Sequence, residues 1–456
     1  MAVRWLERSA ALLIILSNVW VAGVRLAVIC PTTPWESALV VNGVRIAHGQ
    51  PVYAADRAAG IYAPLTYYLG ALETKLFGPT VYAPRATSLI ASLLTVTLLA
   101  FVLREYTGVG LAAAVLLAVN WRAGDYFVDS RPDAVATLFG LLFLVLIYRA
   151  LERCRPALHL AALACLLVAF GFKQTLAQVS VIPLLSVWFS DRDKARRELL
   201  WLLAPLITLG ACAAMMRMFF PVAWHFIFEV PTWFPMVRYR LIKAPLDVLS
   251  AMPIVFLAAY CWLNEKWKEP LSIWLFTASL VLFAAGSATA AAVGGSINRF
   301  LPALYALFAF SLCRWRLIIN AQPLLTATAL LLSVFADPQY AVGPTTDLLG
   351  DPAHYRQVVQ TAKALPGRVV CPEDPTIPLL AKGYAGRQVL VEADTVGWRE
   401  RLTQGLVKEL SAADYAIELG HPMAGKWITS DDFVALGFSP VADVGDYRVW
   451  RNTKRP

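Results

Sequence analysis

Two acidic side chains of this 456-residue chain stand where apolar segments end or begin. Glu36 follows the first apolar segment, and Asp133 opens a later one. A carboxylate beside hydrocarbon is costly to ionise unless it is paired, and partial desolvation raises its pKa toward the range of a general base. Each could take a proton from an acceptor hydroxyl or amine. The alternatives are a solvated loop carboxylate for Glu36 and, for Asp133, a charge in the first turn of a helix with Arg131 as its partner.

Basic side chains at comparable positions have the chemistry to bind an anion. Lys173 interrupts what would otherwise be one hydrophobic stretch, so its side chain must snorkel, pair with an acid or bind an anion. Lipid-phosphate binding needs cations at this depth, and arginine offers a bidentate fork for it. The other candidates, for which ordinary snorkelling is also the alternative, are Arg299, Arg85 and Arg240, the last lying near Arg238 and Lys243.

Several kinds of site are not predicted. The sequence has no P-loop, no GxGxxG fingerprint, no HExxH and no GxSxG motif. The five histidines are scattered, and the seven cysteines show no CxxC spacing, so neither a disulfide framework nor a metal motif follows. Asp129 and Asp133 could in principle bind a divalent ion, but two carboxylates at this spacing are a weak signal for a metal site. We therefore predict no cofactor and no metal site.

The elements that position these groups are hydrophobic helices. With 58% hydrophobic and 16% charged residues, the chain is too apolar for a soluble globular protein. The first apolar segment is long enough to cross a membrane and lacks a small-residue cleavage site, so we interpret it as a retained span. At about 20 residues per crossing we predict about eleven spans, at 10–29, 85–103, 107–120, 133–149, 157–172, 174–190, 199–219, 247–263, 271–292, 300–313 and 317–335.

The basic residues predict the orientation of these spans. The net charge of +9 comes from residues at the ends of apolar segments, which favours membrane anchoring over nucleic-acid binding. A cytoplasmic N terminus puts every short basic loop on the cytoplasmic side, namely those with Arg104, 149–155, 192–197, 266–268 and 314–316. The opposite face then receives the loop 30–80, segment 120–132, the turn at Lys173, the aromatic and basic loop 220–245, segment 294–299 and the C-terminal region.

The composition changes after the last span, which divides the chain into a transmembrane part, 1–335, and a C-terminal part, 336–456. The C-terminal part has ordinary charge density and predicts a small extracytoplasmic α/β domain. Its expected strands lie at 368–371, 388–391, 415–418 and 447–450, with helices near 352–365 and 398–411.

The order of these motifs resembles the C-type superfamily of integral-membrane glycosyltransferases, near its protein O-mannosyltransferase and aminoarabinose transferase branch. Glu36, followed by Gly49-Gln50-Pro51-Val52-Tyr53, is similar to the family's acidic motif and its G-x-P-x-Y continuation. Residues 62–85, 131–133 and the pair Lys173-Gln174 provide the other matches. Many members have Asp-Glu where this chain has Trp35-Glu36, which leaves the base open between Glu36 and Asp133.

The resemblance implies an enzyme of a bacterial inner membrane that transfers a sugar from a polyprenyl-phosphate donor, with inversion, to an acceptor outside. Glu36 or Asp133 would deprotonate the acceptor. The donor phosphate would be held by Lys173 and Arg299, with Arg85 or Arg240. Expected substrate contacts are Tyr62, Tyr53, Gln174 and Asn298. The donor sugar stays open, and so does the acceptor: protein, lipid A, cell-wall polymer or exopolysaccharide.

Two other classes compete with this interpretation. A lipid or glycan transporter, or a flippase, would place charged groups near the bilayer midplane and often has two related halves. Here the charges gather at one surface, and the sequence shows no internal repeat. A non-catalytic membrane anchor that presents the C-terminal domain would leave the one-sided carboxylates and cations unexplained.

Overall fold

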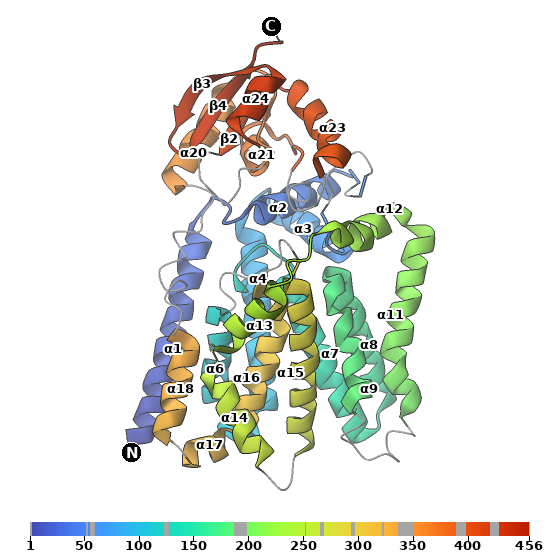
Figure 1. The fold of residues 1–456 in the computed structure, drawn as a ribbon, viewed down its shortest axis with the longest axis vertical. Helices are drawn as coiled ribbons and strands as arrows, with labels where there is room; N and C mark the ends of the chain where they lie inside the picture. Colours follow the sequence, from blue (N-terminus) through green and yellow to red (C-terminus); the bar gives the residue numbers. More distant parts are fainter. Residues whose placement is uncertain are drawn as a thin grey trace.

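A bundle of helices carries a small β-sheet above one end, with two short helices between the bundle and the sheet (Figure 1). The structure is a computed structural model. It describes residues 2–51, 53–54, 60–122, 127–186, 198–250, 252–264, 269–292, 297–321, 323–335, 351–388, 398–419 and 428–455.

Within these residues, five helices are long and apolar enough to cross a membrane, or six if one bent pair counts as a span. The five are α1 (Ala2–Ala27), α4 (Tyr82–Val102), α7 (Asp133–Arg153), α11 (Leu199–Phe219) and α15 (Pro270–Ala290). The bent pair is α13 (Arg240–Ser250) with α14 (Pro253–Leu263). The protein is therefore a helical membrane protein, while the number of eleven crossings stays a prediction.

The other expected spans form shorter or interrupted helices. These are α6 (Val109–Arg122), α8 (Pro156–Phe172), the 3-10 helix η2 (Gln174–Val181) with α9 (Ile182–Ser186), α16 (Leu301–Cys313), and α17 (Trp315–Ala321) with α18 (Pro323–Phe335). The connections contain α5 (Arg104–Thr107), α12 (Pro221–Trp224), the π-helix η4 (His225–Glu229) and the 3-10 helices η5 (Val230–Trp233) and η6 (Ile297–Phe300).

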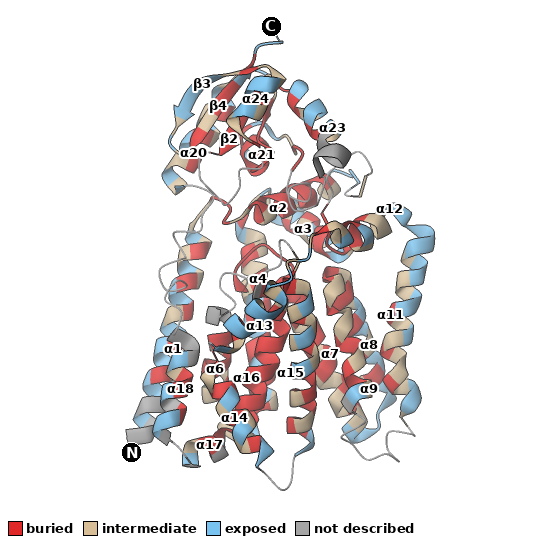
Figure 2. Cartoon of the chain, viewed as in Figure 1, coloured by how far each residue is buried: buried red, intermediate tan, exposed pale blue. Residues whose placement is uncertain are grey.

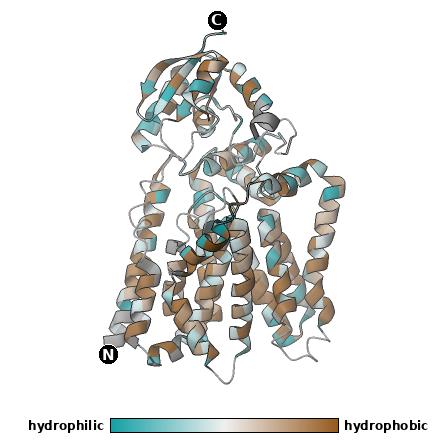
Figure 3. Cartoon of the chain, in the orientation of Figure 1, coloured by the Kyte–Doolittle hydropathy of each residue, from teal (hydrophilic) through white to brown (hydrophobic). Residues whose placement is uncertain are grey.

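The bundle is apolar on its outer surface as well as inside. Its interior is packed with alanine, leucine and phenylalanine side chains, and buried positions line the inner faces of the helices (Figure 2). Large apolar side chains also point outward, as at Leu13, Leu200 and Leu324, which are 50%, 79% and 73% exposed. The hydrophobic colouring along the whole bundle shows the same pattern (Figure 3). An outer surface of this kind suits contact with lipid rather than water.

The loop predicted at 30–80 contains two helices that the sequence reasoning did not anticipate, α2 (Pro34–Ala47) and α3 (Pro64–Phe77). Each begins with a proline in its first turn, where the missing N–H costs no hydrogen bond. They pack closely at two glycines: a Cβ on Gly43 would lie 2.7 Å from the carbonyl carbon of Gly70. The contact therefore requires a residue without a side chain at position 43.

The C-terminal region holds a four-stranded sheet in the order β1-β2-β4-β3. The pair β1 and β2 is parallel, whereas β2, β4 and β3 run antiparallel to their neighbours. The strands are β1 (Val369–Val370), β2 (Tyr415–Leu419), β3 (Phe438–Val444) and β4 (Tyr447–Asn452), and the helices are α20 (Pro352–Ala364), α21 (Thr376–Lys382), α23 (Trp398–Ser411) and α24 (Ser430–Leu436).

Three of the four expected strands coincide with β1, β2 and β4, and both expected helices coincide with α20 and α23. The strand expected at 388–391 lies outside the described residues except for Gln388. Strand β3 was missed because it contains Pro440, where the register with β4 shifts. Within sheets, proline is confined to edge strands and bulges, so a proline in the sequence argues against predicting a strand at that place.

The C-terminal region rests on α2. Arg45 donates hydrogen bonds from Nη2 to the carbonyl oxygens of Gly386, at 2.6 Å, and Ala385, at 3.4 Å. Leu379 of α21 packs with buried valines of α2, including Val41. The helix α2 is thus held between the sheet and the bundle (Figure 1).

Candidate active site

Glu36 lies in the first turn of α2 and is fully buried. Its Oε1 accepts from Nε of Arg85 at 2.9 Å, and its Oε2 accepts from Nη2 at 2.6 Å. The backbone N–H and hydroxyl of Thr32 donate to Oε2, and the same two groups of Ser130 donate to Oε1. Burial disfavours the charged form, but Arg85 and these hydrogen bonds outweigh it and lower the pKa of Glu36 to about 2. The solvated-loop alternative for Glu36 does not hold.

The guanidinium group of Arg85, near the start of α4, also has all of its hydrogen bonds made within the protein. Its remaining N–H groups donate to the carbonyl oxygens of Arg25, Val28 and Cys30, at 2.7, 2.6 and 2.9 Å. With the two bonds to Glu36, all five guanidinium donors are used. The pair therefore joins the end of α1 to α2 and α4, and this structure brings Arg85 to Glu36 rather than to Lys173.

Asp133 and Lys173 form a second buried pair. Asp133 is the first residue of α7, and Lys173 follows the last residue of α8, so the antiparallel packing of the two helices brings the side chains together. Nζ of Lys173 contacts Oδ1 of Asp133, and both residues are at most 3% exposed. The second carboxylate oxygen, Oδ2, is buried without a hydrogen bond from any described residue. Asp133 thus keeps one oxygen that can accept a proton.

Burial and neighbouring cations affect Lys173 strongly. Burial lowers its pKa, Asp133 opposes this, and Arg299 lowers it further, to about 8. Arg299 lies in η6, half-buried, and its Nε has no hydrogen bond among the described residues. Arg131 also lowers the pKa of Lys173, so Lys173, Arg299 and Arg131 lie close enough to one another for their charges to interact. Such a group suits a phosphate.

Arg131 is not the partner of Asp133 that its position in the chain suggested. Its Nε pairs with Asp129 at 2.9 Å, and its Nη2 donates to the hydroxyl of Thr33 at 3.0 Å. Asp129 and Asp133 therefore have separate cationic partners, Arg131 and Lys173. Within the described chain, no three His, Cys, Asp or Glu residues lie close enough to hold a metal ion.

The expected substrate residues lie around this cluster. The ring of Tyr62 is buried, and the charges of Asp133 and Arg299 both act on it. Tyr53 donates its hydroxyl hydrogen to the carbonyl oxygen of Tyr62 at 2.5 Å, which orders the segment before α3. Asn298 is buried next to Arg299 in η6.

Gln174 holds two loops together. Its Nε2 donates to the carbonyl oxygens of Ile61, at 2.9 Å, and Ile227, at 3.0 Å. Its Oε1 is buried and has no hydrogen bond from any residue that the structure describes. Arg240, by contrast, lies half-buried on α13, and no contact between it and this cluster is found in the described part of the chain.

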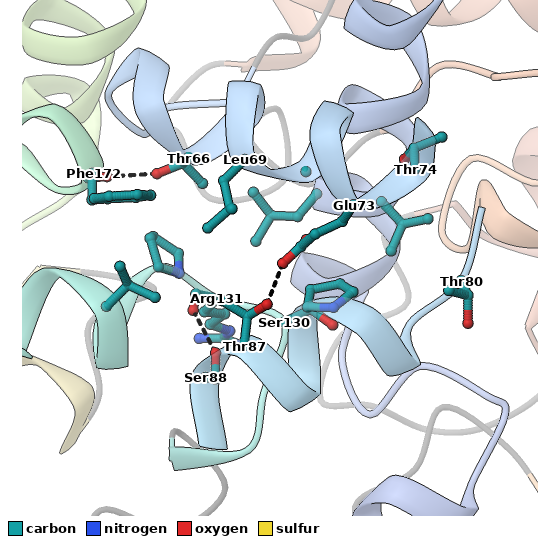
Figure 4. Close-up of a pocket in the computed structure, with 16 residues that line it drawn as sticks. Thr66, Leu69, Glu73, Thr74, Thr80, Thr87, Ser88, Ser130, Arg131 and Phe172 are labelled. Atoms are coloured by element: carbon teal, nitrogen blue, oxygen red, sulfur yellow. Dashed lines mark hydrogen bonds between the residues drawn. The ribbon is translucent and has the colours of Figure 1, made fainter. Parts of the chain in front are cut away.

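Glu73 is a buried acid that the sequence reasoning missed. It lies in α3, is 7% exposed and lines a pocket between α3 and α4 (Figure 4). Burial raises its pKa, while a hydrogen bond from the Thr87 hydroxyl opposes the shift. The only available sequence signal was an acid within a short, largely apolar helix.

Three comparisons bear on the identity of the chain. Residues 62–225 match the sequence model of the family described as dolichyl-phosphate-mannose-protein mannosyltransferase. No curated protein matches the sequence significantly.

Two solved structures share the fold. ArnT from Cupriavidus metallidurans bound to undecaprenyl phosphate is 15% identical, with a TM-score of 0.60 over 97% of this chain and 98% of that one. The oligosaccharyltransferase AglB from Archaeoglobus fulgidus, in complex with an inhibitory peptide and a dolichol-phosphate, is 12% identical, with a TM-score of 0.52 over 99% of this chain and 74% of that one. The expected resemblance is confirmed: the chain has the fold of the C-type integral-membrane glycosyltransferases, and residues 62–225 carry a family sequence signal.

Proposed function

We propose that this protein transfers a sugar from a polyprenyl-phosphate donor to an acceptor at the outer surface of a bacterial inner membrane, with inversion. The observation that carries the proposal is the buried Asp133–Lys173 pair, with Oδ2 of Asp133 unpartnered among the described residues. The undecaprenyl phosphate bound to ArnT and the lipid-linked mannose in the matched family's description support the donor class.

Asp133 is the proposed general base. Its Oδ2 accepts the proton of the acceptor hydroxyl while the hydroxyl oxygen forms a bond to the anomeric carbon. The bond from that carbon to the phosphate oxygen breaks, and the electron pair leaves with the phosphate. Lys173 and Arg299 stabilise the charge that develops there. Glu36 does not take this role because its pKa is about 2 and six donors already occupy its oxygens.

Glu36 and Arg85 instead position the base. The carboxylate of Glu36 binds both the N–H and the hydroxyl of Ser130, three residues before Asp133. This fixes the segment that leads into α7. The expected roles of Glu36 as base and Arg85 as phosphate ligand are therefore replaced, in this proposal, by a structural ion pair.

The proposed orientation puts this cluster outside the cytoplasm. Helix α7 has 21 residues and spans about 30 Å, the thickness of the hydrocarbon core. Asp133 stands at one end, and Arg149 and Arg153 stand at the other, where the positive-inside rule expects basic residues. With eleven crossings and a cytoplasmic N terminus, the C-terminal region lies on the same side as Asp133.

The test is transfer in proteoliposomes that hold the full chain, a radiolabelled undecaprenyl-phosphate sugar and an envelope extract as acceptor. We expect label in the extract, and Lys173→Met should weaken donor binding at least tenfold, as loss of a buried phosphate contact predicts. Asp247→Asn, which alters an exposed carboxylate of α13, is the control. Lipid translocation without transfer would favour the transporter instead.

A further inference from the structure

A pocket beside Asp133 has no part in the mechanism above. It lies between α3, α4 and the start of α7, and Figure 4 shows the side chains that line it. Toward the Asp133–Lys173 pair it is bounded by Pro132 and Phe172, each adjacent in the chain to one member of that pair. The rest of its polar lining is hydroxyl-rich, with Thr66, Thr74, Thr80, Thr87, Ser88 and Ser130.

Glu73 provides the carboxyl group of this pocket, and it has no counter-ion among the described residues. Its side chain points toward Thr87, whose hydroxyl donates to Oε1 at 2.5 Å (Figure 4). Oε2 has no hydrogen bond from any residue that the structure describes. A buried carboxyl with one neutral partner is costly in an apolar protein interior. A ligand that donates hydrogen bonds into the pocket would satisfy it.

The lining selects among ligand classes. A phosphate would face Glu73, and the nearest cation, Arg131, is already paired with Asp129. A prenyl chain would desolvate the carboxyl and the hydroxyls without giving them hydrogen bonds. A sugar ring offers hydroxyl groups to the polar lining and C–H faces to Leu39 and Leu69.

We propose that this pocket binds a sugar ring and that Glu73 is the substrate-binding carboxyl that accepts hydrogen bonds from its hydroxyl groups. The inference rests on the proposed function, which brings the donor sugar to Asp133 and, where the acceptor is a glycan, a second sugar. The ring belongs either to the donor or to a glycan acceptor, and the same chemistry recognises both.

The donor arm of the test measures dissociation constants in nanodiscs for undecaprenyl phosphate and for undecaprenyl phosphomannose, with mannose chosen after the matched family. The donor ratio is the dissociation constant for undecaprenyl phosphate divided by that for undecaprenyl phosphomannose, and it isolates the contribution of the sugar. We expect Glu73→Ala to reduce this ratio about two- to twelvefold, the effect of one net hydrogen bond, and to leave undecaprenyl phosphate binding unchanged. Glu73→Gln should recover part of it, because its amide oxygen still accepts from a hydroxyl.

The acceptor arm measures competition of transfer by methyl α-mannoside and methyl α-glucoside. If the pocket holds the acceptor ring, Glu73→Ala raises their inhibition constants by the same factor, and the donor ratio stays at its wild-type value. Either pattern supports the proposal and identifies the source of the ring.

The melting temperature of each Glu73 variant in detergent reports separately what the hydrogen bond between α3 and α4 contributes to stability. Glu152→Gln, an exposed acid of α7 at the opposite end, is the matched control. If all Glu73 variants keep wild-type donor ratios and inhibition constants, the pocket proposal is overturned while transfer stands. A wild-type protein that neither binds these lipids nor transfers sugar overturns the proposed function and this inference together.

Discussion

Glu36 shows how a residue that looks catalytic in the sequence can serve structure. Glu36→Gln would leave the guanidinium of Arg85 buried without its counter-charge, at a cost of about 3–5 kcal/mol. We expect a much lower melting temperature in detergent, while the fraction that stays folded should lose far less turnover than Asp133→Asn does. Glu152→Gln, at an exposed pair, should change stability by less than about 1 kcal/mol. A Glu36→Gln protein of normal stability but without activity would show that Glu36 is the base.

The titration of Lys173 should make donor affinity and transfer depend on pH in the alkaline range. Its pKa of about 8 means that the ammonium is charged below that pH and becomes neutral as the pH rises through it. The phosphodiester of the donor does not titrate in this range. Donor affinity and transfer should therefore fall between pH 7 and pH 9.5. Lys173→Arg keeps its charge throughout and should flatten the fall. A wild-type rate that is constant to pH 9.5 would argue against a phosphate-binding role for Lys173.

At the scale of elements, the contact between α2 and α3 controls the geometry of the first loop. Gly43→Ala would put a Cβ 2.7 Å from the backbone of Gly70, so the helices must separate. We expect a loss of about 1–3 kcal/mol, measured by thermal unfolding. Gly70→Ala is the matched control, because its Cβ meets its nearest neighbour at an ordinary 3.4 Å. Equal melting temperatures for the two variants would contradict this account of the contact.

The elements also explain what the sequence could and could not predict about the site. Asp133 and Lys173 are 40 residues apart, and two successive antiparallel helices return the chain to the same end, so their shared face was predictable. The ion pair between Glu36 and Arg85 was not predictable from the sequence. Arg85 reaches it because the end of α1, the start of α2 and the start of α4 converge, and hydrophobic periodicity says nothing about such convergence. Glu73 was missed for the same reason, since its role depends on the packing of α3 against α4.

At the scale of the whole molecule, the attachment of the C-terminal region to α2 should depend on pH. Asp374 is fully buried beside Ser37, and burial raises its pKa to about 6, although Thr376 opposes the shift. Because the folded state favours the protonated acid, the stabilisation is complete below about pH 4 and is lost as the pH rises through 6, on the order of 3 kcal/mol.

Limited proteolysis measures this dependence through the release of the C-terminal region. Release should be slower at pH 5 than at pH 7.5, and Asp374→Asn should remove most of the difference, because its amide does not titrate. If Asp374→Asn and the wild type show the same difference between the two pH values, another group is responsible.

The measurement that tests the central claim most directly is the turnover of Asp133→Asn in proteoliposomes, with Asp247→Asn as control. The asparagine keeps the shape of the side chain but cannot accept the proton, so we expect transfer at saturating donor to fall about 10²–10⁴-fold. Because Lys173 loses its buried counter-charge, the melting temperature should fall as well, and turnover is therefore compared for the folded fraction of each protein. Wild-type turnover in a folded Asp133→Asn protein would contradict the assignment of Asp133 as the base.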